Sequence, residues 1–183
     1  MKVVAIVGMA GAGKTEVARL FEKEGFTRIR FGDITDEEVR KQGWELNEDN
    51  ERRARESLRK RYGMAAYAMF NLSRIDSALK TTPVVIDGLY SWEEYIFLKG
   101  YYQDKLYVVA IFTSPQARYQ RLCIRGERPL TVEEAAGRDR AEVEGINKSG
   151  PIAMADFTIV NQATLKELKR EVRQVIATLE RKD

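Results

Sequence analysis

GMAGAGKT, residues 8–15, directly follows an apolar run, VVAIV, and opens a segment whose apolar residues recur with helical spacing. The stretch matches the pattern GxxxxGK[ST], and it lies between a strand-like and a helix-like segment, which is where that pattern must lie in order to bind phosphate. A chance match is expected in about one chain in a hundred of this length, from average residue frequencies alone. We therefore interpret residues 8–15 as a phosphate-binding loop (P-loop).

Each residue type in this loop has a chemical task. Glycines allow successive backbone N–H groups to turn toward phosphate oxygens, and a helix that starts at Lys14 adds its own unpaired N–H groups. Lys14 is predicted to hold the β and γ phosphates, and the hydroxyl of Thr15 to bind Mg²⁺. The predicted nucleotide-binding residues of the loop are Gly8, Met9, Ala10, Gly11, Ala12, Gly13, Lys14 and Thr15.

Five short runs of β-branched and aromatic residues predict the strands of an α/β fold. Most of these runs are continuously apolar, which is typical of strands covered on both faces, and helical segments separate them, which indicates a parallel sheet. We expect a three-layer P-loop NTPase fold, with helices on both faces of a five-stranded parallel sheet in the order 2-3-1-4-5. The predicted strands are residues 3–7, 27–31, 84–86, 106–112 and 157–160.

The 183 residues fit a single domain, which the long segment between the second and third strands enlarges. About fifty residues with helical pattern are more than a plain crossover requires, so we expect a helical insertion at about 34–80 that binds the acceptor. One continuous helix is predicted over residues 49–79. Its apolar residues Tyr62, Met69 and Phe70 are interpreted as core.

Arginines crowd the first half of this predicted helix. They could clamp a phosphate of the acceptor, or form a solvated face with ordinary i,i+4 ion pairs such as Glu51 with Arg55. The sequence leaves both interpretations open. The residues concerned are Arg52, Arg53, Arg55, Arg59 and Arg61.

Composition excludes several classes of function. The chain contains no histidine, so Ser-His-Asp hydrolysis and histidine-ligated metal sites are ruled out. A single cysteine, Cys123, cannot form an internal disulfide. No targeting segment and no apolar stretch approaching about 18 residues is present, so we expect a cytoplasmic protein without a membrane partner. The net charge of +3 is spread along the chain and does not indicate nucleic-acid binding.

A carboxylate follows the third predicted strand. Asp87-Gly88 stands where P-loop proteins carry the aspartate that holds Mg²⁺, so Asp87 is predicted as a metal ligand beside Thr15. The sequence Asn147-Lys148-Ser149-Gly150 lacks the aspartate of a guanine-reading Asn-Lys-x-Asp motif, which argues against a GTPase. Small-molecule and nucleotide kinases remain.

Three motifs resemble the nucleoside-monophosphate kinase family, adenylate kinases especially: Phe31-Gly32-Asp33, Asp87-Gly88, and RLCIRG at residues 121–126. Residues 155–168 resemble the end of dephospho-CoA kinases. Over nearly its full length the chain is most similar to an archaeal group related to both families. The resemblance implies an ATP- and Mg²⁺-dependent kinase of a small nucleotide-like acceptor, either a nucleoside monophosphate or a dephospho-CoA-like molecule.

The resemblance also implies roles for residues outside the P-loop. Arg121 would pack over the adenine, and Arg125 would contact the transferring phosphates. Residues 126–145 would form a short lid, from which Arg138 or Arg140 reaches the phosphates. The loop along the adenine ring would be Asn161, Gln162 and Ala163.

The acceptor side is less determined. By the resemblance, Asp33 lies near the acceptor hydroxyl, where it would accept a proton, but capping a helix is an equally good interpretation of Asp33. Adenylate kinases carry Asp-Gly-Phe-Pro-Arg where this chain has DGLYS at residues 87–91, so the arginine expected on the acceptor phosphate is missing there. A different class also stays open: a P-loop ATPase that acts as a nucleotide-dependent switch or assembly factor, with slow hydrolysis and no metabolite acceptor.

Overall fold

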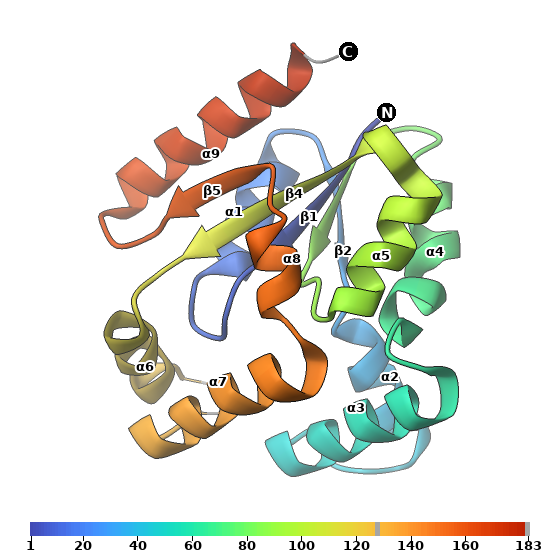
Figure 1. Ribbon diagram of the computed structural model, residues 1–183, viewed down its shortest axis with the longest axis vertical. Helices are drawn as coiled ribbons and strands as arrows, with labels where there is room; N and C mark the ends of the chain where they lie inside the picture. Colours follow the sequence, from blue (N-terminus) through green and yellow to red (C-terminus); the bar gives the residue numbers. More distant parts are fainter. Residues whose placement is uncertain (127–128, 182–183) are drawn as a thin grey trace.

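The computed structural model describes residues 1–126 and 129–181 (Figure 1). Within these ranges, five parallel strands form one sheet in the order β2-β3-β1-β4-β5, which confirms the predicted fold. β1 lies at the centre because both of its neighbours pair with it along its whole length or nearly so. The strands are β1 (Val3–Val7), β2 (Thr27–Arg30), β3 (Val84–Asp87), β4 (Leu106–Phe112) and β5 (Phe157–Val160).

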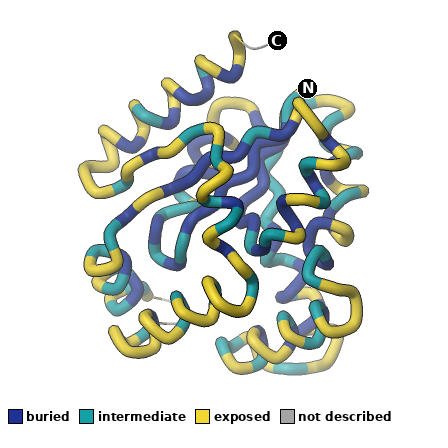
Figure 2. Tube along the Cα trace, in the orientation of Figure 1, coloured by how far each residue is buried: buried dark blue, intermediate teal, exposed yellow. Residues whose placement is uncertain are grey.

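Helices cover both faces of the sheet and make it the middle of three layers. One face packs against α1 (Lys14–Lys23) and α9 (Leu165–Glu180). The opposite face packs against α4 (Ala66–Ala78), α5 (Trp92–Tyr102) and, at its edge, the short α8 (Ser149–Ala153). Every residue of β1 is completely buried as a result, and Figure 2 shows this buried centre beneath exposed helix surfaces. The sheet is therefore rigidly held where the P-loop leaves it.

Four more helices surround the carboxyl ends of the strands, in the lower half of Figure 1. They are α2 (Asp33–Lys41), α3 (Glu48–Tyr62), α6 (Pro115–Ile124) and α7 (Val132–Ile146). A small separate core of Ala10, Leu122 and Ala135 joins the P-loop to α6 and α7. A single 3₁₀ turn, η1 (Gln103–Lys105), connects α5 to β4. Among the described residues, no helix combines the length and the apolar character needed to cross a membrane.

The predicted single helix over residues 49–79 is wrong, because two helices, α3 and α4, fill this range. The chain turns at Gly63, whose φ of +85° is unfavourable for other residues. The break changes the direction of the chain, so the apolar periodicity does not continue from α3 into α4. Tyr62, Met69 and Phe70, which were predicted to lie in the core, are 48%, 49% and 39% exposed.

Candidate nucleotide site

The backbone of residues 8–15 adopts a conformation that requires glycine. Gly11 has a φ of +77°, and a Cβ placed there would lie 2.8 Å from the backbone oxygen of Arg118. Gly13 has a φ of +99°, and its Cβ would collide with the side-chain amide of Asn161. The glycines therefore meet two demands at once, an unusual backbone angle and close contact with α6 and with the segment after β5.

Lys14 is the first residue of α1, and its ammonium is held by the loop itself. The Nζ atom donates to the backbone oxygens of Gly8, at 2.9 Å, and Met9, at 3.0 Å. Burial and, second in size, the positive charge of Lys148 lower the pKa of Lys14 to about 7. An anion beside this ammonium would restore its charge, because an opposite charge favours the protonated form.

Thr15 and Asp87 come from different elements and meet at the carboxyl end of β3. The Thr15 hydroxyl donates to Asp87 Oδ1 at 3.3 Å. The other carboxylate oxygen of Asp87 accepts two bonds from Arg28 of β2, at 3.0 and 2.6 Å. Asp87 is only 3% exposed, so this carboxylate is fixed from both sides.

The donor atoms at this point fit Mg²⁺. A hydroxyl and a carboxylate are hard oxygen ligands, and Mg²⁺ is usually bound by one or two such groups together with waters and substrate phosphates. Among residues 1–126 and 129–181, no group of three or more His, Cys, Asp or Glu side chains gathers in a way that could hold a metal alone. Thr15 and Asp87 would therefore hold Mg²⁺ jointly with the phosphates of a nucleotide.

A cavity of about 400 Å³ opens beside the P-loop, between α1 and α6. Arg121 of α6 and Arg125, the residue that follows α6, line this cavity together with residues of the loop. The lining residues are Gly11, Gly13, Lys14, Thr15, Arg121, Leu122 and Arg125.

The segment after β5 is tied to the same region. Arg121 donates to the backbone oxygen of Asn161 at 2.9 Å, and the Asn161 side chain donates to the backbone oxygen of Ala12 at 2.9 Å. Gln162 and Ala163, the other members of the predicted adenine loop, are exposed. The structure thus joins Arg121 and Asn161 at one end of the P-loop and leaves the two following residues open to solvent.

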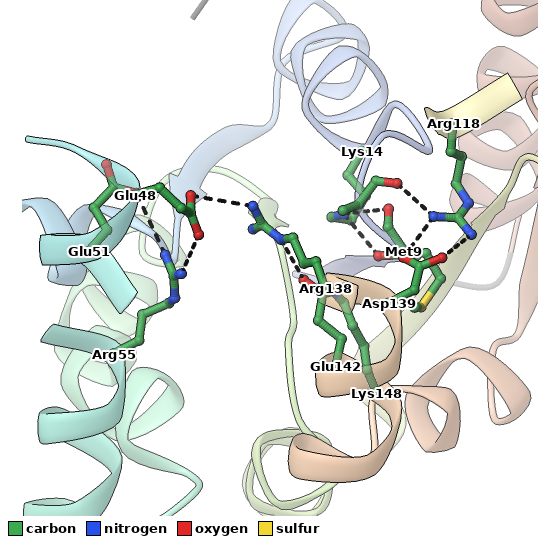
Figure 3. A network of polar contacts seen from close by, with 12 residues as sticks. Met9, Lys14, Glu48, Glu51, Arg55, Arg118, Arg138, Asp139, Glu142 and Lys148 are labelled. Atoms are coloured by element: carbon green, nitrogen blue, oxygen red, sulfur yellow. Dashed lines mark hydrogen bonds and ion pairs between the residues drawn. The ribbon is translucent and has the colours of Figure 1, made fainter. Parts of the chain in front are cut away.

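Of the two candidate lid arginines, Arg138 is half-buried and Arg140 is exposed. Arg138 lies on α7 between two carboxylates, with Nε 3.3 Å from Glu142 and NH1 3.5 Å from Glu48 (Figure 3). Glu48 begins α3, so this arginine links α7 to the inserted helices. Residues 127–128 of the predicted lid lie outside the described residues.

Asp33 is the first residue of α2, after the capping residue Gly32. Its carboxylate accepts a bond from Arg30 at 2.8 Å, and the same guanidinium group donates to Asp36 at 2.8 Å. The interpretation of Asp33 as a helix cap is therefore wrong, because its side chain pairs with a guanidinium and makes no cap hydrogen bond. The carboxylate is about half exposed at the same edge of the sheet as Asp87.

The arginines of α3 do not act as one clamp. Arg52 points outward beside Asp49, whereas Arg55 is paired with Glu48 at 2.7 Å and with Glu51 at 3.6 Å, so the predicted i,i+4 pair is present. Arg59 is directed inward, 4.0 Å from the buried carboxylate of Glu94 and over the ring of Tyr67. Arg53 covers the ring of Trp44, and Arg61 pairs with Glu38.

Several residues around the P-loop were not singled out as functional from the sequence. Arg118 of α6 is 4% exposed and joins the backbone oxygen of Ala10 to Asp139 of α7. Lys148 is 1% exposed and is paired with Glu142 at 2.7 Å. Arg118 stands one helical turn before Arg121, a spacing that was available in the sequence. Nothing in the sequence around Lys148 indicated a functional role, because residues 147–150 do not complete a guanine-recognition motif.

The sheet order and the P-loop define this chain as a P-loop NTPase domain with a kinase-like fold. A family model described as an AAA domain matches residues 4–145. The chain belongs to the UPF0200 family: it is 36% identical over 179 residues to the UPF0200 protein TK1334 of the archaeon Thermococcus kodakarensis, covering 95% of this chain and 96% of the relative. The UPF0200 protein PF1294 of Pyrococcus furiosus is 34% identical, with 97% of each chain covered. The predicted kinship with an archaeal group is thus confirmed.

Solved structures share the fold at low sequence identity. TT1252 from Thermus thermophilus superimposes with a TM-score of 0.66 at 17% identity, covering 97% of each chain. A gluconokinase from Sinorhizobium meliloti superimposes with a TM-score of 0.62 at 15% sequence identity, covering 97% of this chain and 93% of the other. Shikimate kinase from Acinetobacter baumannii gives 0.60 at 21%, covering 97% and 94%. These likenesses establish the fold alone, and the resemblance to adenylate and dephospho-CoA kinases stays a prediction.

Proposed function

We propose that this protein is a kinase that uses ATP and Mg²⁺ to phosphorylate a small nucleotide-like acceptor. The observation that carries the proposal is the contact between Thr15 Oγ1 and Asp87 Oδ1, 3.3 Å, next to a loop that holds Lys14. Phosphoryl transfer depends on positioning and on neutralising phosphate charge, which is what this combination supplies. The gluconokinase and the shikimate kinase that share the fold are consistent with the proposal.

The donor half would be built from the P-loop and α6. The backbone N–H groups of residues 8–15 would hold the phosphates, and Lys14 and Arg125 would neutralise them. Arg121 would pack over the adenine beside the loop of Asn161, Gln162 and Ala163. Mg²⁺, when bound at Thr15 and Asp87, neutralises charge on the phosphate oxygens.

The acceptor half would lie between the P-loop and the inserted helices, within a single domain of 183 residues. The insertion at about 34–80 would bind the acceptor, and residues 126–145 would close over the phosphates through Arg138, excluding water. Asp33 would accept the proton of a hydroxyl acceptor, such as that of a dephospho-CoA-like molecule. An acceptor phosphate, as in a nucleoside monophosphate, needs no base.

The experiment is an acceptor screen with ATP, Mg²⁺ and purified protein. AMP, CMP, UMP and dephospho-CoA are offered separately, and phosphorylated product is measured against a reaction without acceptor. We expect one acceptor to give product, Lys14→Met to abolish product formation, and Lys166→Met, at an exposed lysine of α9, to keep it. With a hydroxyl acceptor Asp33→Asn should lower the rate by a factor of about 100 or more, and with a phosphate acceptor it should have little effect.

The opposite result is equally clear. If none of the acceptors gives product above the reaction without acceptor, while a protein or RNA partner changes the rate of ATP hydrolysis, the kinase proposal fails. The chain would then be a nucleotide-dependent switch or assembly factor.

A further inference from the structure

Lys148 is a buried charge that neither the P-loop motif nor the proposed roles above account for. It immediately precedes α8 and is 1% exposed. Its Nζ donates to Glu142 Oε2 at 2.7 Å and lies 5.4 Å from the centre of the Tyr90 ring. Burying an ammonium group costs free energy even when the group is paired, which favours a role for Lys148 beyond joining α7 to α8.

Glu142 is shared between two cations. One of its oxygens accepts from Lys148, and the other accepts from Arg138 Nε at 3.3 Å. Burial raises the pKa of Glu142, but the neighbouring positive charges outweigh this effect and hold the pKa at about 2, so this carboxylate is ionised at neutral pH. Both cations therefore converge on a single anionic group at the end of α7.

Lys148 lies close to the end of β3, beside the proposed nucleotide site. The Tyr90 ring that its ammonium covers packs against Gly88, since a Cβ placed at Gly88 would lie 2.7 Å from the Tyr90 hydroxyl. Gly88 directly follows Asp87, the predicted metal ligand. Figure 3 shows Arg138, Glu142 and Lys148 on the α7–α8 segment in the same close-up as Lys14, with Arg138 reaching to Glu48. Two carboxylates, Glu142 and Glu48, therefore balance the charges of Lys148 and Arg138.

The position of Lys148 also relates it to the acceptor side. Tyr90, which its ammonium covers, follows Asp87 by three residues, and the Tyr90 ring packs against that of Tyr67 on α4, with centroids 5.9 Å apart. Lys148 therefore lies near both the predicted metal ligand and the inserted helices. In a kinase this is the region in which the phosphoryl group passes from donor to acceptor.

We propose that Lys148 is a second phosphate-binding lysine, which contacts the terminal phosphate of a bound nucleoside triphosphate, and that Glu142 is the anion this phosphate replaces. On binding, the Lys148 ammonium exchanges its bond to Glu142 for a bond to a phosphate oxygen. Arg138 keeps Glu142 in place through its Nε atom. The proposal rests on the nucleotide site proposed above and adds to it a preference for triphosphate over diphosphate.

The test compares the affinities of two ligands, with Mg²⁺ present, by calorimetry: the non-hydrolysable triphosphate analogue adenosine 5′-(β,γ-imido)triphosphate, and ADP. We expect Lys148→Met to lower the affinity for the triphosphate analogue by about tenfold or more, which is the effect of losing one charge-assisted hydrogen bond. The affinity for ADP should be unchanged. Glu142→Gln should increase the affinity for the triphosphate analogue, because it removes the anion that competes with the phosphate for Lys148. If the Lys148–Glu142 salt bridge has no role in binding phosphate, each variant should change the affinities for both ligands in the same direction.

Two controls separate binding from folding. Lys148→Met with Glu142→Gln in one chain leaves no unpaired buried charge, and its ratio of triphosphate to diphosphate affinity should match that of Lys148→Met alone. Lys166→Met, at an exposed lysine, should keep the wild-type ratio. If the wild-type protein binds both ligands and the double variant keeps the wild-type ratio, the role of Lys148 is refuted and the nucleotide site stands. If the wild-type protein binds neither ligand, the proposed function itself fails.

Discussion

Arg118 of α6 holds Asp139 of α7 with two hydrogen bonds, of 2.9 and 2.6 Å, and the same guanidinium donates to the backbone oxygen of Ala10 in the P-loop at 3.0 Å. The arginine side chain is 5% exposed and that of the aspartate 15%. One buried ion pair thus fixes the P-loop, α6 and α7 relative to one another. The donor site therefore depends on a contact that need not touch the nucleotide.

Asp139→Asn should lower the free energy of unfolding by about 3 kcal/mol, because it leaves a buried guanidinium without its counter-charge. Urea unfolding measures the loss. The matched control is Glu37→Gln, since Arg74 donates two bonds to Glu37, at 2.8 and 2.9 Å, but both side chains are more than 40% exposed. The control should lose less than about 1 kcal/mol. Equal losses in the two variants would contradict the role given to Arg118.

Gly13→Ala should destabilise the protein by more than Gly25→Ala. Both glycines have a similar positive φ, +99° and +95°, which costs an alanine about 1–2 kcal/mol. Only at Gly13 would the new Cβ also collide with the Asn161 amide, whereas nothing lies within 4 Å of a Cβ at Gly25.

Chemical denaturation of four chains tests this prediction: Gly13→Ala, Gly25→Ala, Asn161→Ala, and Gly13→Ala combined with Asn161→Ala. In the combined variant the Asn161 amide is absent, so Gly13→Ala should cost only the free energy of the unfavourable backbone angle and not that of the collision. If the combined variant is no more stable than the sum of its single changes predicts, the collision with Asn161 is not a reason why residue 13 must be glycine.

Glu94→Gln should remove a pH dependence of stability between about 4.5 and 7. Burial raises the pKa of Glu94 from 4.5 to about 7, so in this range the folded protein binds a proton that the unfolded chain has lost. The free energy of unfolding therefore falls as pH rises through the window, by at most about 3 kcal/mol. No histidine is present, so no other side chain has its ordinary pKa between about 5 and 7.

The measurement is a series of urea unfolding curves across this range. Glutamine can still accept from the backbone N–H of Tyr90, which Glu94 binds at 2.8 Å, so the start of α5 is kept. Glu167→Gln is the matched control, because Glu167 occupies the same position in the capping box of α9 but is exposed, and its pKa is lowered. The control should retain the fall in stability, and a fall retained by Glu94→Gln as well would rule out Glu94 as its source.

The parts of the site that could be predicted from sequence are those whose chemistry is local. The P-loop is one continuous stretch, and Asp87 ends a strand whose apolar run is unmistakable. The sheet order followed once these two features placed the fold. Arg121 and Arg125 were proposed from one short motif, RLCIRG, which spans the end of α6.

The remaining contacts depend on how distant elements pack. Arg28 meets Asp87 only because β2 pairs with β3, and Lys148 meets Glu142 only because the chain turns sharply after α7, where Asn147 has a φ of +46°. The error over residues 49–79 has a related cause. A single glycine changed the direction of the chain, and a periodicity read across it assigned exposed side chains to the core.

β2 forms one edge of the sheet, and edge strands are where sheets from different molecules join. Its sequence, TRIR, places arginines at positions 28 and 30; Arg28 is paired with Asp87 and Arg30 with Asp33. Charged side chains on an edge strand discourage another strand from adding to it. The two arginines therefore have a second consequence, because they disfavour edge-to-edge aggregation of the folded protein.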